Sequence, residues 1–216
     1  MEQRAKRLYR AKVAGRLLAY VPFLRLAGLN GSLVRGDDNE QSDVDFLIIA
    51  VPGRLYTARF FSHLLIHLTG WRRYGRKTTD RICLNCYLTA IHPNITPRNP
   101  ASLFKVAQSN KYMIPLVDDG QTAHRFFKTN EWFSAHQVEN REVSQRIAKQ
   151  LLGGKPPCRP KYILEKTLGG KFGDWLEQKL MTWQQHRIRR GIREGDETLA
   201  TVDEIRSHPH KFSAPL

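Results

Sequence analysis

The spacing of apolar residues predicts a helix and two strands in the first fifty residues. Between residues 3 and 20 an apolar side chain recurs every fourth position, as at Ala5, Tyr9, Val13 and Leu17, which is typical of an amphipathic helix. The short apolar run Leu24–Asn30 predicts a strand. A second strand is expected over Asp43–Val51, and its central residues are apolar on both faces. Such a strand lies inside a sheet that is covered on both sides.

Further along, the pattern alternates again and then becomes helical. An apolar helix is expected over Leu55–Leu68, closed by Gly70, and a strand over Ile82–Thr89. Prolines at 93, 97 and 100 interrupt the pattern. Beyond them we expect helices at 100–110, 121–128, 139–152 and 160–189, with glycines 169, 170 and 173 interrupting the last one.

This order of elements predicts an α/β (α+β) fold. A small mixed-sheet core occupies residues 1–98, a mostly helical region follows over 99–193, and residues 194–216 form a loosely ordered tail.

Composition narrows the class of protein. The 216 residues are 41% hydrophobic, enough for a packed core. The longest apolar run, Phe46–Val51, is far shorter than the ~20 residues that a membrane helix needs. Three cysteines do not make a disulfide framework, which favours a cytoplasmic location. Basic residues throughout the first helix exclude a secretory signal, and we favour a structural helix over a mitochondrial-type presequence.

The charge points to an anionic partner. Thirty-five Lys and Arg against 20 Asp and Glu give a net charge of +15, which suits a nucleic acid, a nucleotide or an acidic surface, although solubility alone also explains it.

Against this background the acids of residues 37–45 are unusual. Asp43 and Asp45 are spaced i, i+2 at the start of a buried strand, so their side chains project from one face. Two carboxylates that close repel each other unless a cation neutralises them, and Mg²⁺ takes carboxylates together with phosphate oxygens. Upstream, Gly31 and Ser32 follow a strand, where glycine lets a phosphate approach the backbone and the hydroxyl can donate to it. The alternative is a capping Asp43 and a solvated Asp45.

The segments Gly31-Ser32-Leu33-Val34-Arg35-Gly36 and Ser42-Asp43-Val44-Asp45-Phe46 together resemble the signature of the polymerase-beta-like nucleotidyltransferase superfamily, especially its minimal bacterial and archaeal members. The resemblance implies a Mg²⁺-dependent (or Mn²⁺-dependent) transfer of an NMP from a nucleoside triphosphate to an acceptor hydroxyl, with release of pyrophosphate. It implies that Asp43 and Asp45 are the catalytic metal ligands and that Gly31, Ser32, Arg35 and Ser42 contact the phosphates. For Arg35, an ion pair with Asp37 or Asp38 is an equally good interpretation.

One element of the resembling pattern is missing. The superfamily's third carboxylate belongs on a neighbouring strand, and the corresponding residue of Ile82–Thr89 is Asn85, which alternation places on one face with Cys83, Tyr87 and Thr89. An amide offers an oxygen to a metal but carries no charge and takes no proton. Asp80 and Glu40 are the candidates to replace it.

Other motifs leave further functions open. Cys83-Leu84-Asn85-Cys86 is formally a zinc-type pair, but in a strand the two cysteines point to opposite faces; His63 and His67 are expected to be helix-surface histidines. Each of the basic segments 72–77 and 186–193 is either a solvated run of charge or a surface that suits nucleic acid. The stripe of Trp175, Leu176, Leu180 and Trp183 suits packing or a protein partner. Besides the transferase, we therefore expect either a catalytically impaired nucleic-acid-binding module or a partner-binding protein of the toxin–antitoxin kind that uses its helical half.

Overall fold

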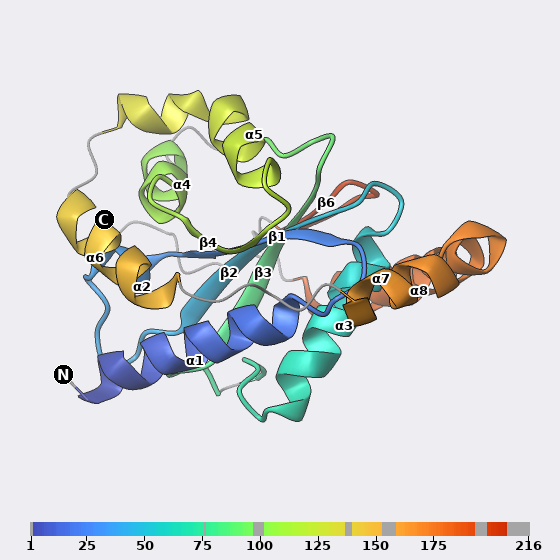
Figure 1. The fold of residues 1–216 in the computed structure, drawn as a ribbon, viewed down its shortest axis with the longest axis horizontal. Helices are drawn as coiled ribbons and strands as arrows, with labels where there is room; N and C mark the ends of the chain where they lie inside the picture. The colour runs from blue at the N-terminus through green and yellow to red at the C-terminus, as the bar shows by residue number, and fades with distance from the viewer. Residues whose placement is uncertain are drawn as a thin grey trace.

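A mixed sheet forms the centre of the chain (Figure 1). The computed structural model describes residues 2–75, 77–96, 102–136, 140–152, 159–192 and 198–206. Within these ranges six strands pair in the order β4-β1-β2-β3-β6-β5. Of these, β2 and β3 run parallel, and the other neighbours are antiparallel. The strands are β1 Leu24–Asn30, β2 Val44–Ala50, β3 Ile82–Thr89, β4 Ile114–Asp118, β5 Leu199–Ala200 and β6 Glu204–Arg206.

Helices cover both faces of this sheet, which confirms the predicted α/β (α+β) class. On one face α1 (Glu2–Leu18) and α3 (Leu55–Leu68) pack on a core that includes Phe46 and Ile48 (Figure 1). On the other face Leu47 and Ile49 contact a second core with α4 (Leu103–Asn110), α5 (Thr122–Thr129) and the 3₁₀ helix η2 (Glu131–Ala135). The strand β2 is therefore apolar on both sides, as its sequence predicted.

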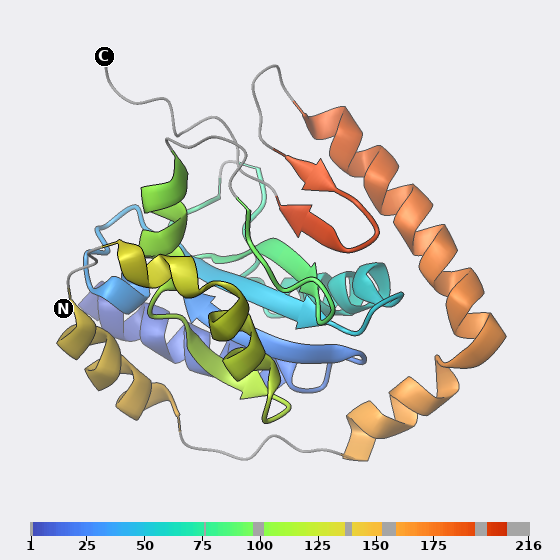
Figure 2. The same ribbon diagram turned by 90° about the horizontal axis from the view of Figure 1, so that it is seen from above.

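The remaining helices lie at the periphery (Figure 2). The short α2 (Ser32–Arg35) follows β1 and contacts α6 (Arg141–Leu151). Helix α8 (Gly170–Gly191) packs beside α3 and follows α7 (Arg159–Thr167). In the part of the chain that is described, no helix is long and apolar enough to cross a membrane.

The structure corrects three expectations in the second half. First, the mostly helical region contributes a strand, β4, which pairs with β1 at the edge of the sheet. Pro115 concealed it, because proline breaks central strands but is tolerated at an edge, where its missing N–H costs no ladder bond. Second, residues 199–206 of the expected loose tail form β5 and β6. Backbone pairing with β3 orders them, and Ile205 is buried. Residues 207–216 lie outside the described ranges.

Third, α8 passes through Gly173 without a break, although the chain does break between α7 and Gly170 as expected. A Cβ at Gly173 would lie 1.7 Å from the carbonyl oxygen of Leu168, so this glycine permits the close approach of the end of α7 to α8. Along α8, Trp175 and Trp183 are 55% and 50% exposed. They are not core residues, and a partner surface there stays a prediction.

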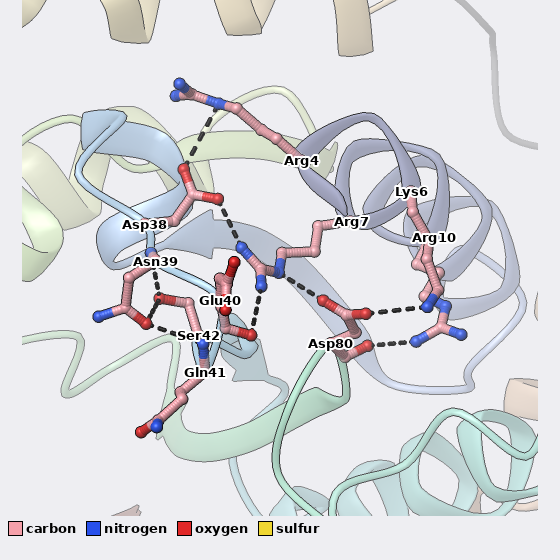
Figure 3. Close-up of polar contacts among 10 residues, drawn as sticks. All are labelled: Arg4, Lys6, Arg7, Arg10, Asp38, Asn39, Glu40, Gln41, Ser42 and Asp80. Carbon is pink, nitrogen blue, oxygen red and sulfur yellow. Dashed lines mark hydrogen bonds and ion pairs between the residues drawn. The ribbon is translucent and has the colours of Figure 1, made fainter. Parts of the chain in front are cut away.

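A buried arginine ties α1 to the loop that leads into β2 (Figure 3). The Arg7 side chain is only 2% exposed; its Nε donates to Asp80 (2.7 Å) and its Nη1 to Asp38 (2.7 Å). Its Nη2 donates to the backbone oxygen of Glu40 (3.0 Å). Because Asp80 precedes β3 and Asp38 precedes β2, one guanidinium fixes the starts of both parallel strands against α1.

We predict that Arg7→Ala lowers the free energy of unfolding by about 3–5 kcal/mol, because it leaves two carboxylates poorly compensated at a buried site. The matched change Lys6→Ala removes another partner of Asp80 from the same helix, but the Lys6 side chain is 51% exposed, so its cost is at most about 1 kcal/mol. Urea unfolding of both variants measures the difference, and equal losses would contradict the assigned role of Arg7.

A second prediction concerns acid stability. Burial raises the pKa of Asp80, but hydrogen bonds from Lys6 and Arg7 outweigh it and hold that pKa below its ordinary value. The resulting stability is complete above the unfolded pKa of roughly 3.9 and is lost as the pH falls towards the lower folded pKa. Urea unfolding at about pH 6 and about pH 3 should therefore show a smaller loss of stability in Asp80→Asn than in the unmodified chain. An identical loss would show that Asp80 is not the titrating group.

Candidate functional site

The turn between β1 and α2 requires glycine. Gly31 has φ 78° and ψ −158°, a backbone conformation that is open only to glycine. A Cβ at this position would lie 2.7 Å from Oδ2 of Asp45. The bend therefore brings the backbone of Gly31 into contact with a carboxylate of the neighbouring strand, which is paired with β1 through Asn30 and Asp45.

Two carboxylates and a thiol meet at the start of β2 and β3. Asp45 pairs with Cys83 in the parallel ladder, and Asp43 directly precedes β2. One oxygen of each aspartate and the Sγ of Cys83 all lie within 4.8 Å of one another. The expectation that Asp43 and Asp45 project together is thus confirmed, and the carboxylate cluster, as we call Asp43, Asp45 and Cys83, is the candidate site.

Burial and the proximity of the two aspartates determine the electrostatics of the carboxylate cluster. Burial, together with the charge of Asp43, raises the pKa of Asp45 to about 7, in spite of the hydrogen bond from Cys83 and the charges of Arg73 and Arg35. Burial and the same two aspartates raise the pKa of the Cys83 thiol well above its ordinary value. The thiol is therefore neutral, and the negative charge of the cluster comes from oxygen.

A nearby arginine supplies positive charge that sequence analysis did not assign to this site. Arg73 Nη1 donates to Asp43 Oδ2 at 2.5 Å and lies 3.5 Å from Cys83 Sγ. From the sequence, Arg73 is predicted only to belong to the basic segment 72–77. Its approach depends on the backbone of residues 71–73, which pairs with Ile82 beside the start of β3, and no local sequence signal predicts that pairing.

Asn85 does face the aspartates. Its Nδ2 donates to Asp45 Oδ1 at 3.2 Å. The strand reaches this arrangement through a bulge: Phe46 pairs with Leu84 and Leu47 with Cys86, so Asn85 is the extra residue. The simple alternation predicted for β3 is wrong beyond this point, because Leu84 and Tyr87 join the core on the α3 side, whereas Cys86 and Leu88 join the opposite core. Cys83 and Cys86 consequently share a face.

The two candidate replacements for a third carboxylate serve other purposes. Asp80 is bound by Lys6 and Arg7, as Figure 3 shows, and Glu40 is exposed and contributes its backbone oxygen to Arg7. Neither residue belongs to the carboxylate cluster.

Three of the four expected phosphate ligands, Gly31, Arg35 and Ser42, have protein partners. The Gly31 N–H donates to the carbonyl of Ser109 (3.0 Å). Arg35 pairs with Asp37 (3.0 Å), as the alternative interpretation expected, and its Nη1 also donates to Gln108. The Ser42 hydroxyl exchanges hydrogen bonds with Asn39 within the turn. Ser32 opens α2 directly after Gly31. Phosphate contact by these four residues stays a prediction.

The carboxylate oxygens of the donor set fit a hard cation. The oxygens of two converging carboxylates are donors of the kind that Mg²⁺ or Mn²⁺ takes, and Cys83 adds a sulfur donor of the kind that softer ions take. The Oδ2 of Asp45 next to the Gly31 backbone leaves no room for a larger side chain there, so position 31 is matched to this carboxylate.

Comparison with known proteins does not identify this site. No family model matches the chain, and neither the curated proteins nor the solved structures give a significant match.

Asn85→Asp tests the cluster as a cation site. The new carboxylate adds a third negative charge beside Asp45, so we expect Mn²⁺ affinity to rise about tenfold or more and the cation-free chain to lose stability through like-charge repulsion. Isothermal titration with Mn²⁺ and thermal unfolding with and without Mn²⁺ measure both effects. Unchanged Mn²⁺ binding would mean that Asn85 does not adjoin a cation site.

Proposed function

We propose that the chain is a nucleotidyltransferase that uses Mg²⁺ or Mn²⁺ to transfer an NMP from a nucleoside triphosphate to an acceptor hydroxyl. The observation that carries this proposal is the convergence of Asp43 and Asp45 beside the glycine bend at Gly31. The resemblance of both segments to the polymerase-beta-like superfamily supports it independently of the geometry.

The charges of the cluster support the cation requirement. Burial of Asp45, together with the charge of Asp43, raises the pKa of Asp45 to about 7, so the charged form of this pair is unfavourable without a cation. Arg73 offsets part of this cost at Asp43. A divalent cation, when bound, would neutralise the remaining charge, lower the pKa of the acceptor hydroxyl and align it with the α-phosphate.

The proposal assigns a specific role to each residue of the candidate site. Asp43 and Asp45 hold the cation, and Arg73 exchanges its contact with Asp43 for one with a phosphate oxygen. The bend at Gly31 and Ser32 lets the triphosphate approach the cation. Arg35, released from Asp37, is a bidentate donor to the same phosphates.

A catalytically impaired binding protein is the second candidate function, and Asn85 is the observation that favours it. The amide at this position takes no proton from the acceptor hydroxyl. Nucleotide binding at the cluster would then serve recognition rather than transfer. A protein partner for the helical half and a cytoplasmic location also stay predictions.

The transferase is tested with α-labelled NTPs, Mg²⁺ or Mn²⁺, and cellular RNA and protein as acceptors. Asp43→Asn and Asp45→Asn should each lower labelling at least about a hundredfold, because each removes a cation ligand. Asp174→Asn is the matched control, since Asp174 is a 65% exposed carboxylate on α8 that pairs with Arg54.

Two outcomes separate the candidates. Labelling that survives in both site variants would reject the transferase proposal. Triphosphate and Mn²⁺ binding that depends on both aspartates, with no labelling of any acceptor, would support the impaired binding protein.

A further inference from the structure

A cluster of basic side chains lies on the α3 side of the sheet, opposite the carboxylate cluster. Arg59 and His63 come from α3, Arg72 from the segment before β3, and Arg187 from α8; we call these four the arginine cluster. Arg72 Nη1 contacts His63 Nδ1 at 2.8 Å, and the His63 ring stacks on Tyr87 with ring centroids 6.0 Å apart. Arg59 lies over the same tyrosine at 5.8 Å. The prediction that His63 is a surface histidine is wrong, since this residue is half-buried among cations.

The contact between Arg72 and His63 fixes the protons of the imidazole. A guanidinium only donates, so Nδ1 of His63 accepts and the proton of the neutral ring is on Nε2. Burial and the positive charges of Arg59, Arg72 and Arg187 lower the pKa of His63 well below its ordinary value, which agrees with a neutral ring. The Nε2–H is consequently a hydrogen-bond donor.

Three donors of the arginine cluster have no acceptor. His63 Nε2, Arg59 Nε and Arg72 Nε are buried and form no hydrogen bond within the described residues. Because a buried donor without an acceptor is unfavourable, three such donors on neighbouring side chains point to an acceptor that the described residues do not supply. The charges recorded around His63 are all positive, and among the described residues no carboxylate forms an ion pair with Arg59, Arg72 or Arg187. Neither the three unpaired donors nor the positive charges of the arginine cluster have an anionic partner among the described residues.

The rim of the arginine cluster carries exposed aromatic rings under cations. Tyr74 is 47% exposed, with Lys77 Nζ 5.6 Å from its ring centre and His67, one turn after His63, against its edge. On the other side Trp183 is 50% exposed, and Arg187 lies over it at 5.6 Å. Two segments more than a hundred residues apart in sequence therefore contribute to one cluster and its rim: Arg72, Tyr74 and Lys77 come from the first, and Trp183 and Arg187 from the second. Aromatic faces beside cations are the combination that binds single-stranded nucleic acid.

We propose that the arginine cluster is a phosphate-binding site for a single-stranded polynucleotide. The backbone phosphate contacts Arg72 and Arg187 above the donors of Arg59 and His63, and neighbouring bases stack on Trp183 and Tyr74. The site does not depend on the proposed transferase, because it lies on the other face of the sheet from Asp45 and Cys83.

The test uses fluorescence anisotropy of the full chain with a labelled oligouridylate of about 12 nucleotides, in roughly 50 to 200 mM salt. Arg187→Gln should weaken binding roughly fivefold at 0.1 M salt and reduce the slope of log K against log salt by about 0.7, the effect of one lost phosphate contact on a single strand. Arg125→Gln is the matched control, an exposed helix arginine that loses the same charge from α5 on the opposite face. Arg125→Gln should change the affinity and the salt slope only by the small effect of removing one distant positive charge.

One further variant and the assay conditions keep the result clear. Trp183→Leu should weaken binding about tenfold with an unchanged salt slope, because stacking releases no counterions. Oligouridylate binding is measured without Mg²⁺, Mn²⁺ or nucleotide, so failure of the transferase and failure of this site are distinguishable. Because both Arg187 and Trp183 are exposed, we expect neither substitution to unfold the chain.

Three results would overturn the proposal. The first is no oligouridylate binding by the unmodified chain at the lowest salt. The second is equal losses in Arg187→Gln and Arg125→Gln, which would show a diffuse charge effect. The third is competition by inorganic phosphate at the same concentration as oligouridylate, which would assign the site to a free anion instead of a strand.

Discussion

The burial of one carboxylate beside another is the constraint on which the candidate site depends. Asp43 and Asp45 stand at the start of the central strand, beside an apolar core that gives them little screening. The surrounding structure offsets the repulsion between them from several directions: Arg73 pairs with Asp43, Asn85 donates to Asp45, and Gly31 yields the space that a side chain would take from the same carboxylate. Each of the two aspartates thus has a protein donor, Arg73 at Asp43 Oδ2 and Asn85 at Asp45 Oδ1.

The other acids of the same loop have a different role. Asp38 is nearly buried and, with Asp80, surrounds the guanidinium of Arg7. These ion pairs connect α1 to the beginnings of β2 and β3, where the carboxylate cluster is formed. The five acids of residues 37–45, which look like one group in the sequence, therefore have different roles. Asp38 pairs with α1, Asp37 pairs with Arg35, Asp43 and Asp45 face the candidate site, and the Glu40 side chain is exposed.

The sequence predicted most of the first half of the fold because local periodicity determined it. The bounds of β1, α3 and β3 agree with the apolar pattern, and the spacing of Asp43 and Asp45 on one strand was enough to place them together. Long-range pairing accounts for what was missed. Pro115 conceals an edge strand, β5 and β6 are ordered by β3, and the bulge at Asn85 shifts the alternation that a regular strand would keep. Arg73 reaches Asp43 only through the bridge of residues 71–73 to Ile82, which no local pattern encodes.

That bridge has one more consequence. Consecutive residues of an extended segment point to opposite sides. Arg72 accordingly contacts His63 under α3, while its neighbour Arg73 contacts Asp43 on the far side of the sheet. Two adjacent residues thus carry one guanidinium into each of two separate polar environments. The backbone hydrogen bonds of residues 71 and 73 with Ile82 hold this segment beside β3, so a single short stretch of chain contributes a positive charge to both faces of the sheet.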